Sequence, residues 1–124
     1  MPYPDNYTFD SIPLSAYTPS VGTTPVAAYM AAPARGVILR FSGILGGAIT
    51  TANGTVTVTN VTQGTTVGSF VVTQAGSVAG QFQAGAPNSN AVAQVNENDV
   101  LAFTPSGATG ASIPMFFSAL MVVQ

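Results

Sequence analysis

The chain of 124 residues contains no cysteine, histidine, lysine or tryptophan. Without cysteine there is no disulfide, no thiolate nucleophile and no Cys-ligated metal. Without histidine neither a Ser-His-Asp triad nor a His-ligated metal site can form, and without lysine there is no Schiff base and no P-loop lysine. These absences predict a protein that is not an enzyme, with no catalytic residue, no cofactor and no metal.

Charge is scarce as well. Charged residues make up 5% of the chain, against about 25% in a typical domain, and no formal charge lies between Arg40 and Glu97. The net charge is −2. Nucleic-acid binding needs several basic residues to neutralise phosphates, and anionic membrane surfaces attract basic segments. The sequence therefore predicts that neither nucleic acid nor a membrane is a partner.

Long hydrophobic runs are also missing. The longest late apolar run, Ile113–Val123, has 11 residues, whereas a membrane helix needs about 20. The first residues, MPYPDNYTFD, have neither the basic region nor the apolar region of a secretory signal. We therefore expect a soluble chain that is synthesised in the cytoplasm.

Proline and aromatic residues gather in residues 1–34, which hold six of the nine prolines. This density excludes a regular helix or a central strand, so we expect an extended arm that wraps its own domain or a neighbour. The aromatic residues would anchor the arm, and the two arginines would pair with Asp5, Asp10 or a partner's carboxylate. The expected partner-binding residues are Tyr3, Tyr7, Phe9, Tyr17, Arg35 and Arg40.

Residues 35–124 show short β-type segments separated by turn residues. In Gly36–Ser42, alternation places Val37, Leu39 and Phe41 on one face. The last strand, from about Ile113 to Val123, is apolar on both faces, which is typical of a strand buried in a sheet and under a second layer. Further strands are expected over Thr55–Val61, Val67–Thr73, Ser77–Gln83, Ala91–Val95 and Asp99–Thr104, with turns at Asn53-Gly54, Gln63-Gly64 and Ala75-Gly76.

Short strands at spacings of 8 to 12 residues favour a sandwich or barrel, and helix signals are nearly absent. We predict an all-β fold, a jelly-roll-like antiparallel β-sandwich of about eight strands, with the arm preceding it.

The acidic turn NEND, Asn96–Asp99, has two interpretations. Asn and Asp favour turns, which suits a solvated turn before a strand. Four oxygen-bearing side chains could also bind calcium, although the glycine and spacing of an EF-hand are missing. The sequence favours the turn and leaves open whether these residues bind a cation.

The uncharged β-segments indicate a role. Soluble monomers protect strand edges with lysine, other charges or proline, and segments such as TVTVTNV are aggregation hazards. We therefore expect the arm and other protein chains to cover the faces and edges of this domain.

A Pro-rich arm followed by a β-domain ending in NENDVLAFTPSGATGASIPMFFSALMVV resembles the small capsid decoration, or cement, proteins of tailed bacteriophages. The resemblance covers roughly Gly36–Gln124. It implies a jelly roll that forms a homodimer or homotrimer on the outside of an icosahedral capsid. There it would bind the major capsid protein and bridge neighbouring capsid subunits.

A carbohydrate-binding head-fibre or lectin-like β-sandwich module is the alternative. Sugar sites usually offer exposed rigid aromatic rings, whereas this chain has no tryptophan and its tyrosines gather in the expected arm. The structural, virion-bound protein is therefore the favoured interpretation.

Overall fold

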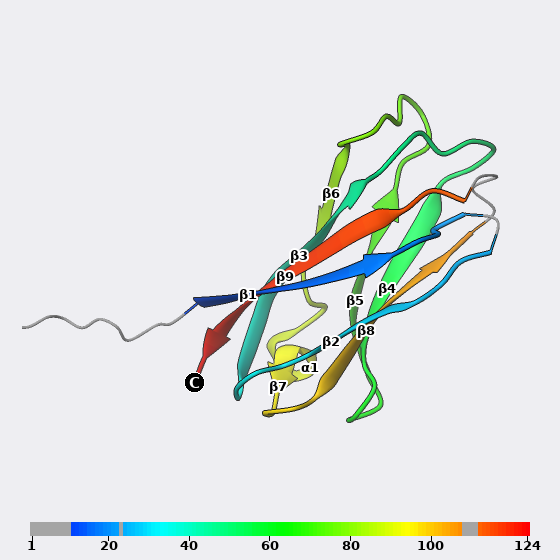
Figure 1. Ribbon diagram of the computed structural model, residues 1–124. Helices are drawn as coiled ribbons and strands as arrows, with labels where there is room; N and C mark the ends of the chain where they lie inside the picture. The colour runs from blue at the N-terminus through cyan, green and yellow to red at the C-terminus, as the bar shows by residue number, and fades with distance from the viewer. Residues whose placement is uncertain (1–10, 23, 108–111) are drawn as a thin grey trace, which may run out of the picture.

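The chain forms two antiparallel β-sheets that pack face to face (Figure 1). The computed structural model describes residues 11–22, 24–107 and 112–124. Sheet A has the strand order β1-β9-β3-β6, with β7 paired to β3. Its strands are β1 (Ser11–Thr18), β3 (Gly36–Leu45), β6 (Phe82–Gly85), β7 (Gln94–Val95) and β9 (Met115–Val123).

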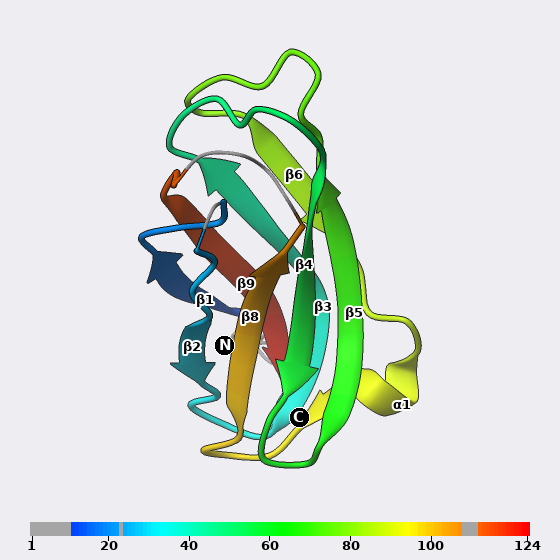
Figure 2. The same ribbon diagram turned by 90° about the vertical axis from the view of Figure 1, so that its right-hand side faces the viewer.

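Sheet B has the strand order β2-β8-β4-β5. Its strands are β2 (Ala28–Ala31), β4 (Gly54–Asn60), β5 (Thr65–Val72) and β8 (Val100–Ser106). Most consecutive strands alternate between sheet A and sheet B. Figure 2 shows the two sheets side by side. This strand order is that of a jelly roll, so the prediction of an all-β sandwich of about eight strands is confirmed.

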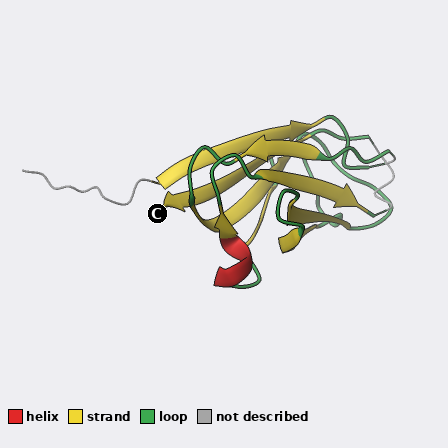
Figure 3. Cartoon of the chain, turned by 90° about the horizontal axis from the view of Figure 1, so that it is seen from below, coloured by secondary structure: helices red, strands yellow, loops and turns green. Residues whose placement is uncertain are grey.

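One short helix, α1 (Asn90–Ala93), lies at the edge of the sandwich (Figure 3). The predicted strand Ala91–Val95 is therefore wrong for its first residues. Ser89 caps the helix, since its side chain accepts a hydrogen bond from the Val92 N–H, and β7 takes up only the last two residues. Within the described ranges, no helix has the length and apolar character needed to cross a membrane.

Four phenylalanine rings join the two sheets at the centre of the core. Phe103 of sheet B stacks on Phe117 of sheet A, with ring centroids 4.9 Å apart. Phe41 meets Phe103 edge-on at 6.3 Å, and Phe70 meets Phe117 at 6.4 Å. Such aromatic pairs contribute about 0.5–1.5 kcal/mol beyond the burial of their area, so this cluster fixes how the layers pack.

The Thr-Val alternation of β4 produces the predicted strand. Val56 and Val58 point into the core, and the threonines between them face outward. The hairpin to β5 turns at Gly64, which has a φ of 73°. The turn predicted at Ala75-Gly76 is also present, with Gly76 at the same φ. These parts of the prediction are confirmed.

Two other local predictions need correction. At Asn53-Gly54 neither residue has a positive φ; Thr51 adopts one instead, at 77°, and Gly54 already begins β4. In Ser77–Gln83 the strand begins only at Phe82, because the chain turns at Gly80, where φ is 88°. The hydrogen bond from the Gly80 N–H to the Leu45 carbonyl ties this turn to the end of β3.

Strand β3 departs from simple alternation. Ile38 pairs with Met121 and Arg40 pairs with Leu120, which leaves Leu39 without a partner on β9. An extra residue of this kind is a β-bulge, and it reverses the faces of the residues beyond it. Ile38 and Phe41 therefore both lie in the core, while Leu39, which was predicted to share a face with Phe41, is exposed.

The predicted arm over residues 1–34 needs correction where the structure describes it. β1 and β2 are strands of the sandwich, so the domain does not begin at residue 35. Both strands lie at sheet edges, where a ladder tolerates the missing N–H of a proline such as Pro13. Residues 1–10, with Tyr3, Tyr7 and Phe9, lie outside the described residues.

Candidate partner-binding face

The outward side of sheet A carries the most unusual surface of the described chain. Strand β9 was predicted to be buried within a sheet and under a second layer because it is apolar on both sides. It does lie in the middle of sheet A, between β1 and β3, but only Met115, Phe117, Ala119 and Met121 are buried against sheet B. The opposite side of the strand is exposed or half-buried within this chain, so burial under sheet B does not explain why that side is apolar too.

A row of four large apolar side chains crosses this surface, and we call it the aromatic row because three of the four are aromatic. The register pairs Tyr17 with Phe116, Phe116 with Ile44, and Ile44 with Phe82, so that one residue comes from each of four neighbouring strands. Their exposed fractions are 52% for Tyr17, 53% for Phe116, 43% for Ile44 and 61% for Phe82. Single exposed apolar residues are normal on a protein surface, but a contiguous row of them is typical of an interaction site.

Small residues form the next row along the strands. Ser118 of β9 pairs with Ser15 on one side and Ser42 on the other, and Ser42 pairs with Ala84. The hydroxyls of Ser42 and Ser118 lie 2.8 Å apart and share a hydrogen bond. Because these side chains are short, the sheet is hollowed beside the taller aromatic row.

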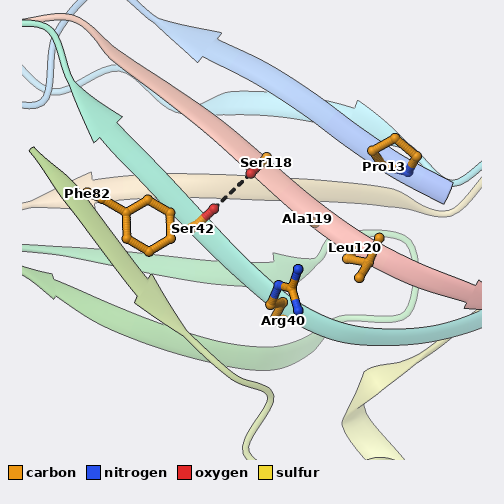
Figure 4. A pocket seen from close by; sticks show the side chains of 7 residues that line it. All are labelled: Pro13, Arg40, Ser42, Phe82, Ser118, Ala119 and Leu120. Carbon is orange, nitrogen blue, oxygen red and sulfur yellow. Dashed lines mark hydrogen bonds between the residues drawn. The ribbon is translucent and has the colours of Figure 1, made fainter. Parts of the chain in front are cut away.

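The third row closes the hollow with larger side chains. Leu120 pairs with Pro13 and with Arg40. Together the rows enclose an open groove of about 270 Å³, seen from close by in Figure 4. The residues that line it are Pro13, Arg40, Ser42, Phe82, Ser118, Ala119 and Leu120. We call the three rows and this groove the apolar face.

Arg40 is the charged residue of the apolar face. It is exposed, and within the described ranges no carboxylate pairs with it. The bulge at Leu39 is the reason for its position, because it sets Arg40 opposite Leu120 on the outer side of the sheet. A guanidinium beside apolar side chains is suited to bind a carboxylate or a carbonyl of a partner.

The outward side of sheet B has a different chemistry. Its residues are mostly hydroxyl-bearing, although Tyr29 and Val71 are exposed among them. The hydroxyl residues are Thr55, Thr57, Thr59, Thr66, Ser69, Thr104 and Ser106. We call this surface the hydroxyl face. Water can solvate it, so the apolar face is the side of the sandwich that other protein would cover.

The structure brings some of the predicted partner-binding residues together and separates others. Tyr17 and Arg40 both lie on the apolar face, at its aromatic row and its groove. Arg35 is exposed in the turn before β3, away from the groove lining. Sequence reasoning missed Ile44, Phe82 and Phe116. The signal was present in β9, whose two apolar sides were interpreted as burial within one chain.

The turn Asn96–Asp99 has a structural role in this fold. Three N–H groups converge on Oδ2 of Asp99: the Asn96 backbone at 2.9 Å, the Asn60 amide at 3.0 Å and the Gln63 amide at 2.7 Å. These bonds lower the pKa of Asp99, with the Asn96 contact the largest cause, while burial acts in the opposite direction. The carboxylate is occupied by donors that tie this turn to the β4–β5 hairpin.

No cluster of three or more His, Cys, Asp or Glu residues that could hold a metal lies within the described ranges. Of the acidic residues there, Asp99 is buried and Glu97 is exposed in the neighbouring turn. The chemistry offered by the described surface is therefore that of apolar contact, hydroxyl hydrogen bonds and one guanidinium at the groove.

Known proteins resemble this chain in structure rather than in sequence. No protein-family model and no curated protein sequence matches the chain. Among solved structures, the chain is similar to one chain of the "Cyanophage Pam1 capsid asymmetric unit". The two share 12% sequence identity and a TM-score of 0.58, over 100% of this chain and 93% of the other. The similarity is one of fold, and it extends over the whole sandwich.

Proposed function

We propose that this chain is a structural protein of a phage virion that binds the outside of an icosahedral capsid. In this role it stabilises the shell by bridging neighbouring copies of the major capsid protein. The observation that carries the proposal is the full-length fold similarity to a chain of a cyanophage capsid asymmetric unit. The resemblance of the sequence to cement proteins of tailed bacteriophages supports the same role independently.

The surface of the sandwich is consistent with contact to other proteins. The apolar face exposes a row of large side chains, and the whole chain has only six charged residues, two basic and four acidic. Contact through apolar and backbone groups needs no charges. An interface of standard size buries about 1,600 Å² in total, and much of its gross hydrophobic gain offsets the cost of association. Attachment of this kind should depend little on salt.

A carbohydrate-binding module is the second candidate, and one observation favours it. The exposed ring of Phe82 lies beside a groove that also offers the hydroxyls of Ser42 and Ser118 and the guanidinium of Arg40 (Figure 4). An apolar ring beside polar groups is a pattern that sugars can use. The continuous apolar row from Tyr17 to Phe82 fits a protein surface better than a small polar ligand.

The test of the first proposal is binding to assembled shells. Purified full-length chain is mixed with undecorated phage capsids and sedimented at low and at high salt. We expect the chain to sediment with the shells at both salt concentrations and to raise the temperature at which they disassemble. The attachment should be weakly salt-dependent because few charges are available for salt to screen.

Two results would count against this proposal. A chain that stays in the supernatant with every shell tested would exclude shell binding, and a steep loss of binding at high salt would exclude the apolar mode of attachment. A glycan array in the same buffers separates the second candidate, since specific glycan binding without shell binding would favour the carbohydrate module.

A further inference from the structure

The apolar face needs an occupant that offers apolar side chains and a carboxylate together. Its aromatic row is half-exposed, while Arg40 lies in the groove beside Leu120 with no described carboxylate paired to it. Covering a guanidinium with a purely apolar surface would leave an unpaired buried charge, which is strongly unfavourable. The occupant must therefore bring an acid to the groove.

Two copies packed with their apolar faces together do not meet this requirement. Each face would contribute an Arg40 and neither would contribute an Asp or Glu from the described residues. Asp99 already accepts three hydrogen bonds in its own turn, and Glu97 belongs to that same turn rather than to the groove. The acid has to come from another segment.

The first ten residues of the chain carry the missing chemistry. The sequence MPYPDNYTFD contains three aromatic residues, Tyr3, Tyr7 and Phe9, and two of the four acidic residues, Asp5 and Asp10. Ten extended residues reach at most about 33–36 Å, whereas the four neighbouring strands β1, β9, β3 and β6 span only about 15 Å. A segment of this length can cross the aromatic row and the groove together.

We propose that residues 1–10 of one copy of the chain bind the apolar face of a second copy. A carboxylate of the segment pairs with Arg40, and its aromatic rings pack on the row from Tyr17 to Phe82. This inference concerns contacts between copies, so it goes beyond the proposed capsid role and does not depend on it.

The position of β1 favours a second copy over the chain's own face. Ser11, the first residue of β1, pairs with Val122 near the end of β9. A segment that returned from this point onto its own sheet would use about four residues to reverse direction. Phe9 and Asp10 would lie within that reversal and could not reach the groove. On a second copy, all three rings and both carboxylates are free to bind.

A charge exchange between two full-length variants tests the proposal. The first is Arg40→Asp, and the second combines Asp5→Arg with Asp10→Arg. Each variant alone places like charges on segment and face, so its self-association should weaken roughly tenfold or more relative to the original chain. An equimolar mixture should regain association, because each segment then meets a face of opposite charge. Sedimentation velocity measures all four samples.

A matched control and a second variant of Arg40 show whether the effect belongs to the charge at this position. Arg35→Asp changes an exposed arginine outside the groove lining and should associate like the original chain. Arg40→Gln removes the charge without reversing it and should weaken association less than Arg40→Asp. Circular dichroism melting of every variant identifies any that has lost its fold.

The outcomes separate the possibilities cleanly. Any of three results would overturn the proposal: the original chain stays monomeric, the variants associate as well as the original chain, or the mixture fails to recover association. Failure of the mixture alone would point to a segment that returns to its own copy. Shell binding is measured separately on the same variants, so loss of either property is distinguished from loss of the other.

Discussion

Tyr17 and Phe116 lie side by side on the outer surface of sheet A, with ring centroids 5.1 Å apart and ring planes inclined by 49°. They come from opposite ends of the chain and meet because β1 pairs with β9 in the register that sets these two residues opposite each other. This contact lies at the β1 end of the aromatic row, and it packs the two rings against each other at that edge of the apolar face.

Replacing Phe116 with serine should weaken self-association of the chain without unfolding it. The side chain is half-exposed and the core does not depend on it, so the cost to the free energy of unfolding should stay near 1 kcal/mol or below. The dissociation constant, measured by sedimentation, should rise by about tenfold. Val71→Ser is the matched control, because Val71 is equally exposed but lies on the hydroxyl face. Equal effects of the two changes would contradict a special role for the apolar face.

Replacing Asp99 with asparagine should destabilise the fold. One carboxylate oxygen accepts three N–H bonds, and the new amide can no longer satisfy all three donors. Leaving buried donors without an acceptor costs about 1–3 kcal/mol. Urea unfolding at neutral pH gives the free energy of unfolding directly. Glu97→Gln, an exposed change in the same turn, should leave stability within about 0.5 kcal/mol of the original.

The same carboxylate predicts a loss of stability in acid. The N–H donors from Asn96, Asn60 and Gln63 lower the pKa of Asp99 in the folded protein. A folded-state pKa below the unfolded value, about 3.9, means that the contribution is fully present above that value. It is lost as the pH falls through the folded pKa. Urea unfolding from pH 6 to pH 2 should therefore show a decline below about pH 4 that is smaller in Asp99→Asn. Identical pH profiles for Asp99→Asn and the original chain would show that Asp99 does not cause the decline.

Two glycines make room for the ring of Phe41. A Cβ atom on Gly68 would lie 2.8 Å from Phe41 Cζ, and one on Gly85 would lie 2.8 Å from Phe41 Cε1. Overpacking of this kind usually costs about 1–3 kcal/mol, so we expect that loss for Gly85→Ala in thermal or urea unfolding. Gly47→Ala is the control, since its new Cβ atom would meet only Ile113 Cδ1, at an ordinary 3.4 Å, and Ile113 Cγ2.

A second change tests the cause of that loss. In the Phe41→Leu background, Gly85→Ala should lower the free energy of unfolding by less than it does in the original chain, because the smaller leucine side chain leaves space. A double-mutant cycle measures this coupling. Additive effects would show that the backbone contact with the Ser69 carbonyl, also 2.8 Å away, dominates instead.

Local patterns predicted the strands well where alternation was regular. Thr55–Val61 became β4 with Val56 and Val58 inside, and Gly64 and Gly76 formed their turns. The local patterns failed where tertiary contacts determine the local structure. The bulge at Leu39 depends on the register between β3 and β9, and the capped helix at Asn90 replaced an expected strand. The proline-rich segment also proved to hold edge strands, which proline permits.

The sequence by itself determined, through the alternation and spacing of its short segments, that this chain is a β-protein, and through its composition that it has few charges and no histidine, cysteine or lysine chemistry. Only the tertiary structure decided that Tyr17, Phe116, Ile44 and Phe82 form one row, and that Arg40 lies beside a groove floored by Ser42 and Ser118. The physical reason is that pairing between strands distant in sequence sets which side chains become neighbours. Alternation along one strand fixes only which of them share a side.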